Sequence, residues 1–272
     1  MTLRMIDAFS GIGGFSLAAR WLGGFETVQF VELEPFCQRI LRKHWPDVPI
    51  HDDICTFNPI PGSADVVVGG FPCQDISQAG KGAGLAGERS GLFYELLRVV
   101  CLVGPRYVVL ENVAAILARG LDDVLGSLAE AGYDCEWACI PASAVGACHQ
   151  RDRWWCVAYA NRQRQQERHP AAVAAQPGQP AWPSAARRLN PNWRNHVSEP
   201  VLRRGDDGLS GRVDRLRSLG NAVVPQVAMV PLARVLELEA RRARLRAASA
   251  ALPSGDFFQQ REHSGTVFAD RI

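Results

Sequence analysis

The strongest constraint on the fold is an alternation, over residues 1–160, of apolar runs rich in β-branched and aromatic residues with amphipathic stretches. The apolar runs predict strands over Arg4–Phe9, Thr27–Val31, Asp65–Gly69, Tyr107–Leu110 and Trp154–Tyr159. The spacing of apolar residues predicts helices over Phe15–Leu22, Pro35–His44, Gly91–Val103 and Leu121–Ala131. Strands that alternate with helices predict an α/β fold with a doubly wound, mainly parallel sheet. Ligands of such sheets bind at the carboxyl ends of the strands.

Changes in composition and periodicity along the chain predict four segments. Residues 1–160 form the predicted catalytic and cofactor-binding domain. Residues 161–212 are rich in Pro, Gln, Ala and Arg without periodicity, which predicts a small loop-rich lobe. Residues 213–247 return through the turn LRSLGNAVVP to a helix that begins at Pro225 and completes the first domain. Residues 248–272 are expected to form a weakly ordered tail.

Charge is unevenly distributed along the chain. Residues 1–160 carry 12 basic and 18 acidic residues, whereas residues 161–217 carry 11 arginines and 5 acidic residues, a net charge of +6. An arginine-rich segment is the expected footprint for a phosphate backbone. The alternative is a solvated surface loop.

Other classes of protein are disfavoured by what the sequence lacks. No apolar run approaches the roughly 20 residues that span a bilayer. The segment MTLRMIDAFSG has no long apolar stretch, so we expect no signal peptide and a cytoplasmic protein. None of the eight cysteines forms a C-x-x-C pair, which argues against a structural zinc site. We therefore expect no metal, and most cysteines as buried thiols.

A glycine-rich turn and two acidic residues point to an adenosine-bearing cofactor. Gly11-Ile12-Gly13-Gly14 joins the first strand to a helix, where glycines allow close approach of the backbone to a ligand. Glu32, about twenty residues further on, ends the second strand and suits a ribose hydroxyl. Asp53 follows another short strand and could accept a hydrogen bond from an adenine amino group. The turn is not G-x-G-x-x-G, so the dinucleotide fingerprint is not met.

Nucleophile and acid are predicted on neighbouring strands. Cys73 follows an apolar strand through the turn Gly69–Pro72, and Glu111 follows the next strand. A nucleophile beside an acid is a pair suited to covalent catalysis. Arg151 and Arg153 precede a further strand and would point the same way from an extended chain.

These motifs, in the order G-x-G-G, acid, D-I, P-C-Q, E-N-V, R-x-R and G-N-A-V, resemble those of the 5-cytosine DNA methyltransferases, in the compact form carried by phages and prophages. The resemblance covers residues 5–159 and 213–230. It implies the fold of the S-adenosylmethionine-dependent methyltransferases, with S-adenosylmethionine as cofactor and double-stranded DNA as partner. It also implies a monomer and a companion restriction endonuclease.

The resemblance assigns roles position by position. It implies that Cys73 is the nucleophile, that Glu111 meets the cytosine ring nitrogen, and that Arg151 and Arg153 position both. The cofactor contacts that it implies are Phe9, Gly11, Gly13, Gly14, Glu32, Leu33, Asp53, Ile54, Pro72, Leu92, Asn221 and Val223. The nucleic-acid contacts that it implies are Gln74, Ser77, Lys81 and Asn112, with Ser77–Leu85 as a loop that closes over a flipped base.

The implied chemistry is methyl transfer to carbon 5 of cytosine through a covalent intermediate. Thiolate addition at carbon 6 makes carbon 5 nucleophilic, and a protonated Glu111 stabilises the ring nitrogen during that addition. Burial must therefore raise the pKa of Glu111. The target base must be flipped out, because the duplex hides it.

The chain departs from the family in three respects. His149 stands where Gln is usual, the recognition segment is short, and only Asn190–Trp193 and Ser198–Pro200 resemble its organising stretch. The chemical site is therefore expected to act with relaxed sequence recognition, or to remain after an internal deletion. The alternatives are a tRNA cytosine methyltransferase of the same architecture, a non-catalytic DNA-binding remnant, and a cysteine hydrolase with His149 as base.

Overall fold

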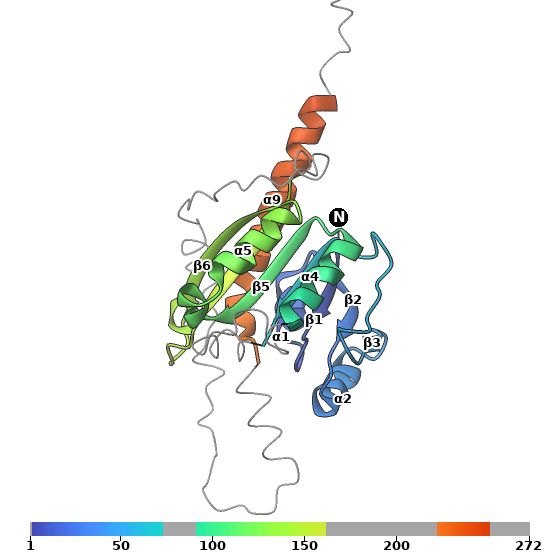
Figure 1. Ribbon diagram of the computed structural model, residues 1–272, viewed down its shortest axis with the longest axis vertical. Coiled ribbons are helices and arrows are strands. Elements are labelled where there is room, and N and C mark those ends of the chain that lie inside the picture. The colour runs from blue at the N-terminus through green and yellow to red at the C-terminus, as the bar shows by residue number, and fades with distance from the viewer. Residues whose placement is uncertain (1, 73–90, 162–221, 251–272) are drawn as a thin grey trace, which may run out of the picture. The chain divides into compact units, whose positions relative to one another are not determined.

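The computed structural model describes residues 2–72, 91–161 and 222–250 (Figure 1). The elements in these ranges are β1 (Leu3–Ala8), α1 (Gly14–Leu22), β2 (Phe25–Val31), α2 (Pro35–His44), β3 (Ile50–His51), β4 (Val66–Gly70), α4 (Gly91–Val103), β5 (Tyr107–Val113), the 3-10 helix η3 (Ala114–Ala118), α5 (Leu121–Glu130), β6 (Tyr133–Pro141), the 3-10 helix η4 (Ala142–Val145), β7 (Asp152–Ala160) and α9 (Pro225–Ala250).

One seven-stranded sheet runs in the order β3-β2-β1-β4-β5-β7-β6. The five strands from β3 to β5 are parallel, and β7 is antiparallel to both of its neighbours. The predicted α/β fold with a mainly parallel sheet is confirmed. The chain order reverses between β1 and β4, which is where a doubly wound sheet opens a crevice for a ligand.

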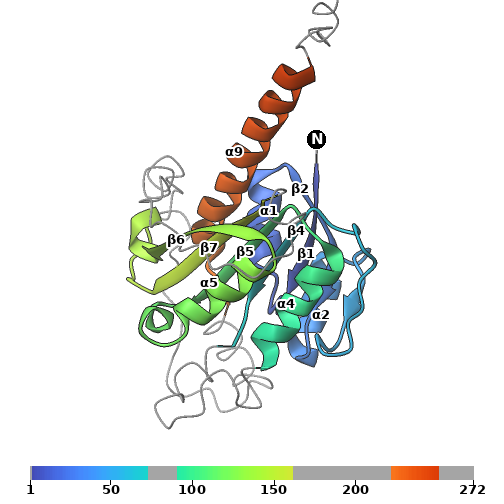
Figure 2. The same cartoon turned by 45° about the horizontal axis from the view of Figure 1, so that its top comes forward.

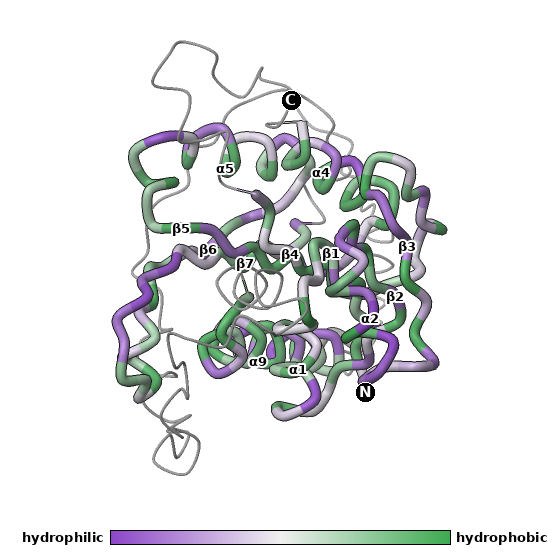
Figure 3. The backbone as a smooth tube through the Cα atoms, turned by 90° about the horizontal axis from the view of Figure 1, so that it is seen from below, coloured by the Kyte–Doolittle hydropathy of each residue, from purple (hydrophilic) through white to green (hydrophobic). Residues whose placement is uncertain are grey.

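Helices cover both faces of the sheet. Figure 2 shows α4 and α5 side by side on one face, and Figure 3 shows α1, α2 and the first turns of α9 on the other. The two adjacent tryptophans of β7 serve one face each, because successive side chains of a strand alternate. Trp154 lies in the core beneath α4 and α5, whereas the ring of Trp155 meets Phe15 of α1 edge to face at 5.8 Å.

The edge strand β6 is the main element that the sequence did not predict. Its sequence alternates apolar and polar residues only from Tyr133 to Trp137, and in the structure most residues of the strand are half-buried rather than alternately buried and exposed. The central strands also extend beyond their predicted ends. β5 continues through Val113, which pairs with Arg153 of β7, and β7 begins at Asp152, which pairs with Pro141 of β6.

The first turns of α9 are fastened to β6 by an ion pair. The Nε and Nη2 atoms of Arg234 each donate to a different carboxylate oxygen of Glu136, both at 2.9 Å. This two-pronged geometry is the strong form of an arginine–carboxylate pair. Contacts divide the chain within α9, into a unit of residues 1–235 and a second unit of residues 236–272. The predicted four-segment division stays a prediction.

The expectation that most cysteines are buried is wrong for the described residues. Only Cys37 and Cys156 are buried, Cys135 and Cys139 are partly exposed, and Cys55, Cys101 and Cys148 are exposed. The exposed ones lie in the loop after β3, in the last turn of α4 and shortly before the first residue of β7. Among the described helices, none has the length and apolar character needed to cross a membrane.

Candidate active site

The strand ends bring the predicted chemical groups to one edge of the sheet. Because β1, β4 and β5 are parallel, the segments after Ala8, Gly70 and Glu111 lie at their shared carboxyl edge. The antiparallel β7 begins at this same edge, with Arg153 opposite Val113. The predicted glycine turn, acid and arginines therefore lie along one edge of the sheet, although they are far apart in the sequence.

The glycine turn after β1 is stabilised by a hydrogen bond within the turn and by the carboxylate of Glu32. Phe9, Gly11 and Gly13 all have positive φ, at 53°, 54° and 86°, and the backbone N–H of Gly13 donates to the Ser10 carbonyl at 2.8 Å. The carboxylate of Glu32 accepts the N–H of Gly11 at 2.7 Å and that of Glu34 at 2.8 Å. Burial raises the pKa of Glu32, which the two N–H donors partly oppose. Each oxygen keeps a lone pair for a further donor.

The returning segment after residue 221 lies directly against this turn. A Cβ atom added at Gly14 would lie 2.7 Å from the carbonyl oxygen of Val223 and 3.0 Å from its Cβ atom. Val223 also faces the end of β4, 3.8 Å from where a Cβ atom of Gly70 would be. Two of the predicted cofactor residues, Gly14 and Val223, are therefore in contact although 209 positions separate them.

We expect Gly14→Ala to weaken binding of the adenosine-bearing cofactor that the sequence predicts by roughly tenfold and to destabilise the fold by about 1–3 kcal/mol. The added methyl group would meet a backbone carbonyl, so the returning segment must shift. The matched control is Gly126→Ala in α5, where a Cβ atom meets nothing within 4 Å. That change should stabilise by about 0.5–1 kcal/mol. Calorimetry measures the cofactor affinity and urea unfolding measures the stability of each variant. Equal affinities in the two variants would contradict the close contact between Gly14 and Val223.

The other predicted cofactor residues lie around the ends of β2, β3 and β4. Leu33 is 71% exposed and presents an apolar side chain next to Glu32. Asp53 is partly exposed and accepts the N–H of Cys55 at 2.9 Å. Ile54 is buried in the core, whereas Pro72 is exposed and Leu92 packs partly buried at the start of α4. The side chain of Ile54 is therefore not available to a ligand.

Asp7 is a buried acid that the sequence analysis did not single out. Its side chain is fully buried, and burial raises its pKa to about 7. One carboxylate oxygen accepts the hydroxyl of Ser16 at 2.6 Å, and that hydroxyl oxygen accepts the hydroxyl of Thr27 at 3.0 Å. The other oxygen has no hydrogen-bond partner among the described residues. The only sequence feature that could have marked Asp7 as a site residue is its position on an apolar strand, two residues before Phe9.

Glu111 has the environment that the implied chemistry requires. Its Oε1 atom pairs with Nε of Arg153 at 3.0 Å, and its Oε2 atom lies 3.0 Å from where a Cβ atom of Gly70 would be. Burial raises the pKa of Glu111 to about 7, against the opposing positive charges of Arg153 and Arg151. The glycine at position 70 thus leaves room for the carboxyl group, which is half protonated near neutral pH.

Arg151 differs from its predicted conformation. It was expected to lie in an extended chain with Arg153, but its φ is 29°, and β7 begins one residue later. The turn sends its guanidinium to the returning segment, where Nη2 donates to the Ala222 carbonyl at 2.8 Å. Arg151 therefore connects the neighbourhood of Glu111 with the segment that contacts Gly14.

Asn112 is placed to hold the chain before Cys73. It is 2% exposed, its Nδ2 atom donates to the Phe71 carbonyl at 3.2 Å, and its Oδ1 atom accepts the N–H of Val113 at 2.8 Å. Both ends of the amide are thus engaged with backbone, and contact with nucleic acid stays a prediction. Five predicted site residues lie outside the described residues: Cys73, Gln74, Ser77, Lys81 and Asn221.

No group of three or more His, Cys, Asp or Glu side chains in the described ranges is arranged to hold a metal ion.

Comparison with known proteins identifies a family for most of the chain. Residues 3–200 match the family described as C-5 cytosine-specific DNA methylase. The chain is 36% identical over 163 residues to the type II methyltransferase M.CviJI of Paramecium bursaria Chlorella virus IL3A, covering 58% of this chain and 43% of that protein. It is 34% identical over 159 residues to the type II methyltransferase M2.BsuMI of Bacillus subtilis, covering 56% and 40%. The matches thus span about two fifths of these relatives.

Solved structures agree on the fold. The Dnmt2 methyltransferase of S. pombe superposes with a TM-score of 0.50 at 18% identity, covering 66% of this chain and 56% of that one. The methyltransferase EhMeth of Entamoeba histolytica superposes with a TM-score of 0.50 at 16% identity, covering 66% and 57%. At such identities the likeness concerns the arrangement of helices and strands alone.

Proposed function

Because the chain belongs to the C-5 cytosine-specific DNA methylase family, we propose that it transfers a methyl group from S-adenosylmethionine to carbon 5 of cytosine in double-stranded DNA. The observation that carries the proposal is the carboxyl group of Glu111. It is largely buried, with 13% of its side chain exposed, its pKa is raised to about 7, and it pairs with Arg153 at the edge of the sheet where Cys73 follows Pro72. A cysteine hydrolase would have no use for an acid of this kind or for the glycine turn.

The described residues fit an adenosine-bearing cofactor. The glycine turn offers backbone in left-handed conformations, which only glycine adopts readily. Glu32 would accept the ribose hydroxyls with its remaining lone pairs, and the exposed side chain of Leu33 would cover the adenine ring. Asp53 would accept from the adenine amino group, and Val223 would close the site against Gly14. When bound, S-adenosylmethionine supplies an electrophilic methyl group on a sulfonium.

The protein's own residues would then carry the base chemistry. The Cys73 thiolate would form a bond to carbon 6, and the electron pair of the carbon 5–carbon 6 double bond would become available at carbon 5. Protonated Glu111 would donate to ring nitrogen 3 and stabilise the charge that gathers there. Carbon 5 would form a bond to the methyl carbon while the carbon–sulfur bond of the sulfonium breaks, leaving its electron pair on a neutral thioether sulfur. A base would then remove the carbon 5 proton, and the returning electron pair would restore the double bond and expel the thiolate.

Arg153 and Arg151 would hold Glu111 and the ring carbonyl in place. Arg153 already fixes one oxygen of the acid at 3.0 Å, which leaves the other oxygen to face the base. Because the target carbon is stacked inside the duplex, we include base flipping in the proposal. The relatives named as type II methyltransferases support, as part of it, a companion restriction endonuclease.

The test is transfer of labelled methyl from S-adenosylmethionine to duplex DNA and to tRNA in parallel, with nucleosides of the product separated by mass. We expect 5-methyl-2′-deoxycytidine from the DNA, in amounts that rise with enzyme and time. Label in the tRNA alone would replace the proposal by an RNA cytosine methyltransferase. If the cofactor binds but label enters neither substrate, the chain is a cofactor-binding remnant.

A further inference from the structure

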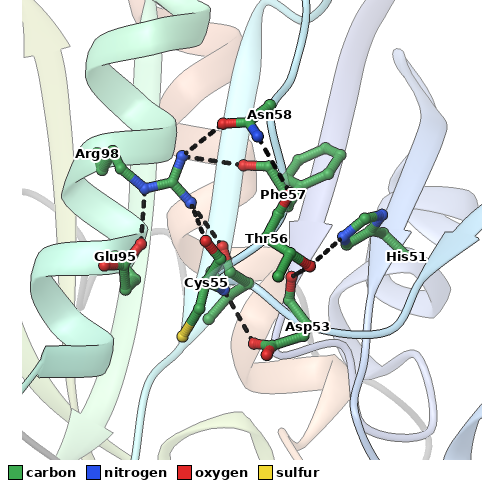
Figure 4. Close-up of polar contacts among 9 residues, drawn as sticks. His51, Asp53, Cys55, Thr56, Phe57, Asn58, Glu95 and Arg98 are labelled. Atoms are coloured by element: carbon green, nitrogen blue, oxygen red, sulfur yellow. Dashed lines mark hydrogen bonds and ion pairs between the residues drawn. The ribbon is translucent and has the colours of Figure 1, made fainter.

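A single arginine of α4 gathers the loop that follows β3. Figure 4 shows the guanidinium of Arg98 directed into this loop, residues 54–58, from the neighbouring helix. Its Nη2 atom donates to the carbonyls of Ile54 at 2.7 Å and Cys55 at 3.3 Å. Its Nη1 atom donates to the Phe57 carbonyl at 3.0 Å and to Oδ1 of Asn58 at 3.2 Å. Four acceptors of one short loop thus converge on one side chain.

The remaining donor of Arg98 fixes the direction of its guanidinium. Nε donates to Oε2 of Glu95, one turn earlier on α4, at 2.6 Å. The guanidinium is planar, with its five N–H donors in a fixed fork, so orienting one side orients the other. Because Glu95 fixes one side of the guanidinium and the loop binds the other, Arg98 connects helix and loop in one fixed orientation (Figure 4).

The loop that Arg98 holds is continuous with Asp53. The Asp53 carboxylate accepts the N–H of Cys55, while the Cys55 carbonyl accepts from Arg98, so the same residue is held at both of its peptide groups. The carbonyl of Asp53 accepts the N–H and the hydroxyl of Thr56, both at 3.2 Å. Movement of the loop would therefore move the Asp53 carboxylate.

The short β3 leaves this loop dependent on such a connection. β3 pairs with β2 through only two residues, so the sheet does little to fix the chain beyond His51. The Nε2 atom of His51 lies 2.9 Å from the Thr56 hydroxyl, and the side chains of Ile54 and Phe57 enter the core. These anchors hold the loop to the core, whereas Arg98 sets the position of its backbone carbonyls.

We propose that Arg98 is a positioning residue for recognition of the adenine base: by fixing residues 54–58 it sets the Asp53 carboxylate at the adenine amino group. This inference rests on the proposed function, since it presupposes an adenosine-bearing cofactor. Arg98 does not itself touch the ligand. Its loss should therefore reduce discrimination between adenine and a base that lacks the amino group, as well as affinity.

The test is calorimetric binding of two probes, S-adenosylhomocysteine and S-inosylhomocysteine, which carries an oxygen in place of the adenine amino group. We expect the wild-type protein to prefer the adenosine probe by at least about tenfold, because an oxygen would face the Asp53 carboxylate unpaired. In Arg98→Met the adenosine probe should bind roughly tenfold more weakly and the preference should fall to about twofold or less.

The matched control is Arg106→Met at the opposite edge of the sheet. Arg106 forms an ion pair that is more buried than that of Arg98, with its Nη2 atom 3.1 Å from Oδ1 of Asp65, so its loss perturbs stability without touching the loop. Its preference for adenine should equal that of the wild type. Arg98→Lys keeps the positive charge but not the planar set of five N–H donors. It should fold like the wild type while losing part of the preference for the adenosine probe.

The outcomes separate the two levels of the proposal. If the wild type binds neither probe, the proposed function itself fails. If the wild type prefers adenine and both Arg98 variants keep that preference, the positioning role is overturned, whatever their melting temperatures. A preference that falls in Arg98→Lys and Arg98→Met but not in Arg106→Met supports the positioning role.

Discussion

Cys73→Ala is expected to abolish methyl transfer to DNA while leaving the affinity for S-adenosylmethionine within a few-fold of wild type. Carbon 5 of cytosine is too weak a nucleophile to accept the methyl group until a thiolate has added at carbon 6. Removal of a covalent nucleophile lowers turnover by roughly 10⁴-fold or more. Single-turnover transfer of labelled methyl to duplex DNA measures the loss, and calorimetry measures cofactor binding.

A second readout reports the covalent bond directly. DNA containing 5-fluorocytosine should trap the wild-type protein as a complex that survives denaturing electrophoresis, because fluorine cannot leave as a proton does. The control is Cys101→Ala, which removes an exposed thiol of α4. This control should transfer methyl groups and form the trapped complex like the wild type. Turnover retained by Cys73→Ala would end the covalent mechanism proposed for this chain.

Glu111→Gln is expected to lower the rate of methyl transfer by about 10²–10⁴-fold, the usual contribution of a general acid. The amide fills the same space beside Arg153 but cannot deliver a proton to the cytosine ring. Cofactor affinity should change little, since the acid lies on β5 and makes no contact with the glycine turn among the interactions observed. The measurement is the single-turnover rate at saturating cofactor and DNA.

The pH dependence of the rate follows from the raised pKa of Glu111. The acid is active when protonated, and burial raises its pKa to about 7, so the rate should fall as pH rises through about 7. Glu111→Gln should lose this decline, since the amide does not titrate. The same shift affects folding: because the folded pKa lies above the unfolded value, Glu111 contributes stability below about pH 4.5 that is lost as pH rises through 7.

Asp65→Asn provides the matched control for Glu111. Asp65 is likewise a carboxylate paired with arginine, with Arg4 at 3.3 Å and Arg106 at 3.1 Å, but at the opposite edge of the sheet. Its loss should lower stability while leaving the rate and the decline above pH 7 as in the wild type. A decline that persists in Glu111→Gln would assign the titration to another group, of which buried Asp7 is the first to examine.

The local pattern of the sequence was sufficient to place the glycine turn and three of the predicted acids along the sheet. Apolar runs that end in glycine or in an acid placed the turn at Gly11–Gly14, and placed Glu32, Asp53 and Glu111, at the correct edge of the sheet. The reason is that a parallel α/β sheet exposes the residues just after its strands, and strand and helix periods can be read from local spacing. The edge strand β6 was missed, because its alternation of apolar and polar residues covers only Tyr133 to Trp137 and stops there.

Interactions between distant segments needed the tertiary structure. The positive φ of Arg151, its bond to Ala222, and the contact of Gly14 with Val223 depend on how the returning segment packs, which no local spacing encodes. The hydrogen bonds of Arg98 likewise join a helix to a loop some forty residues earlier in the chain.

The pKa values of Glu111 and Asp7 were also decided by the tertiary structure. The sequence alone determined the fold class, the order of the motifs and the chemical types at the site, because these follow from residue identity and from periodicity. The charge state of each acid depends instead on burial and on which distant groups surround it, and only the packed structure supplies both.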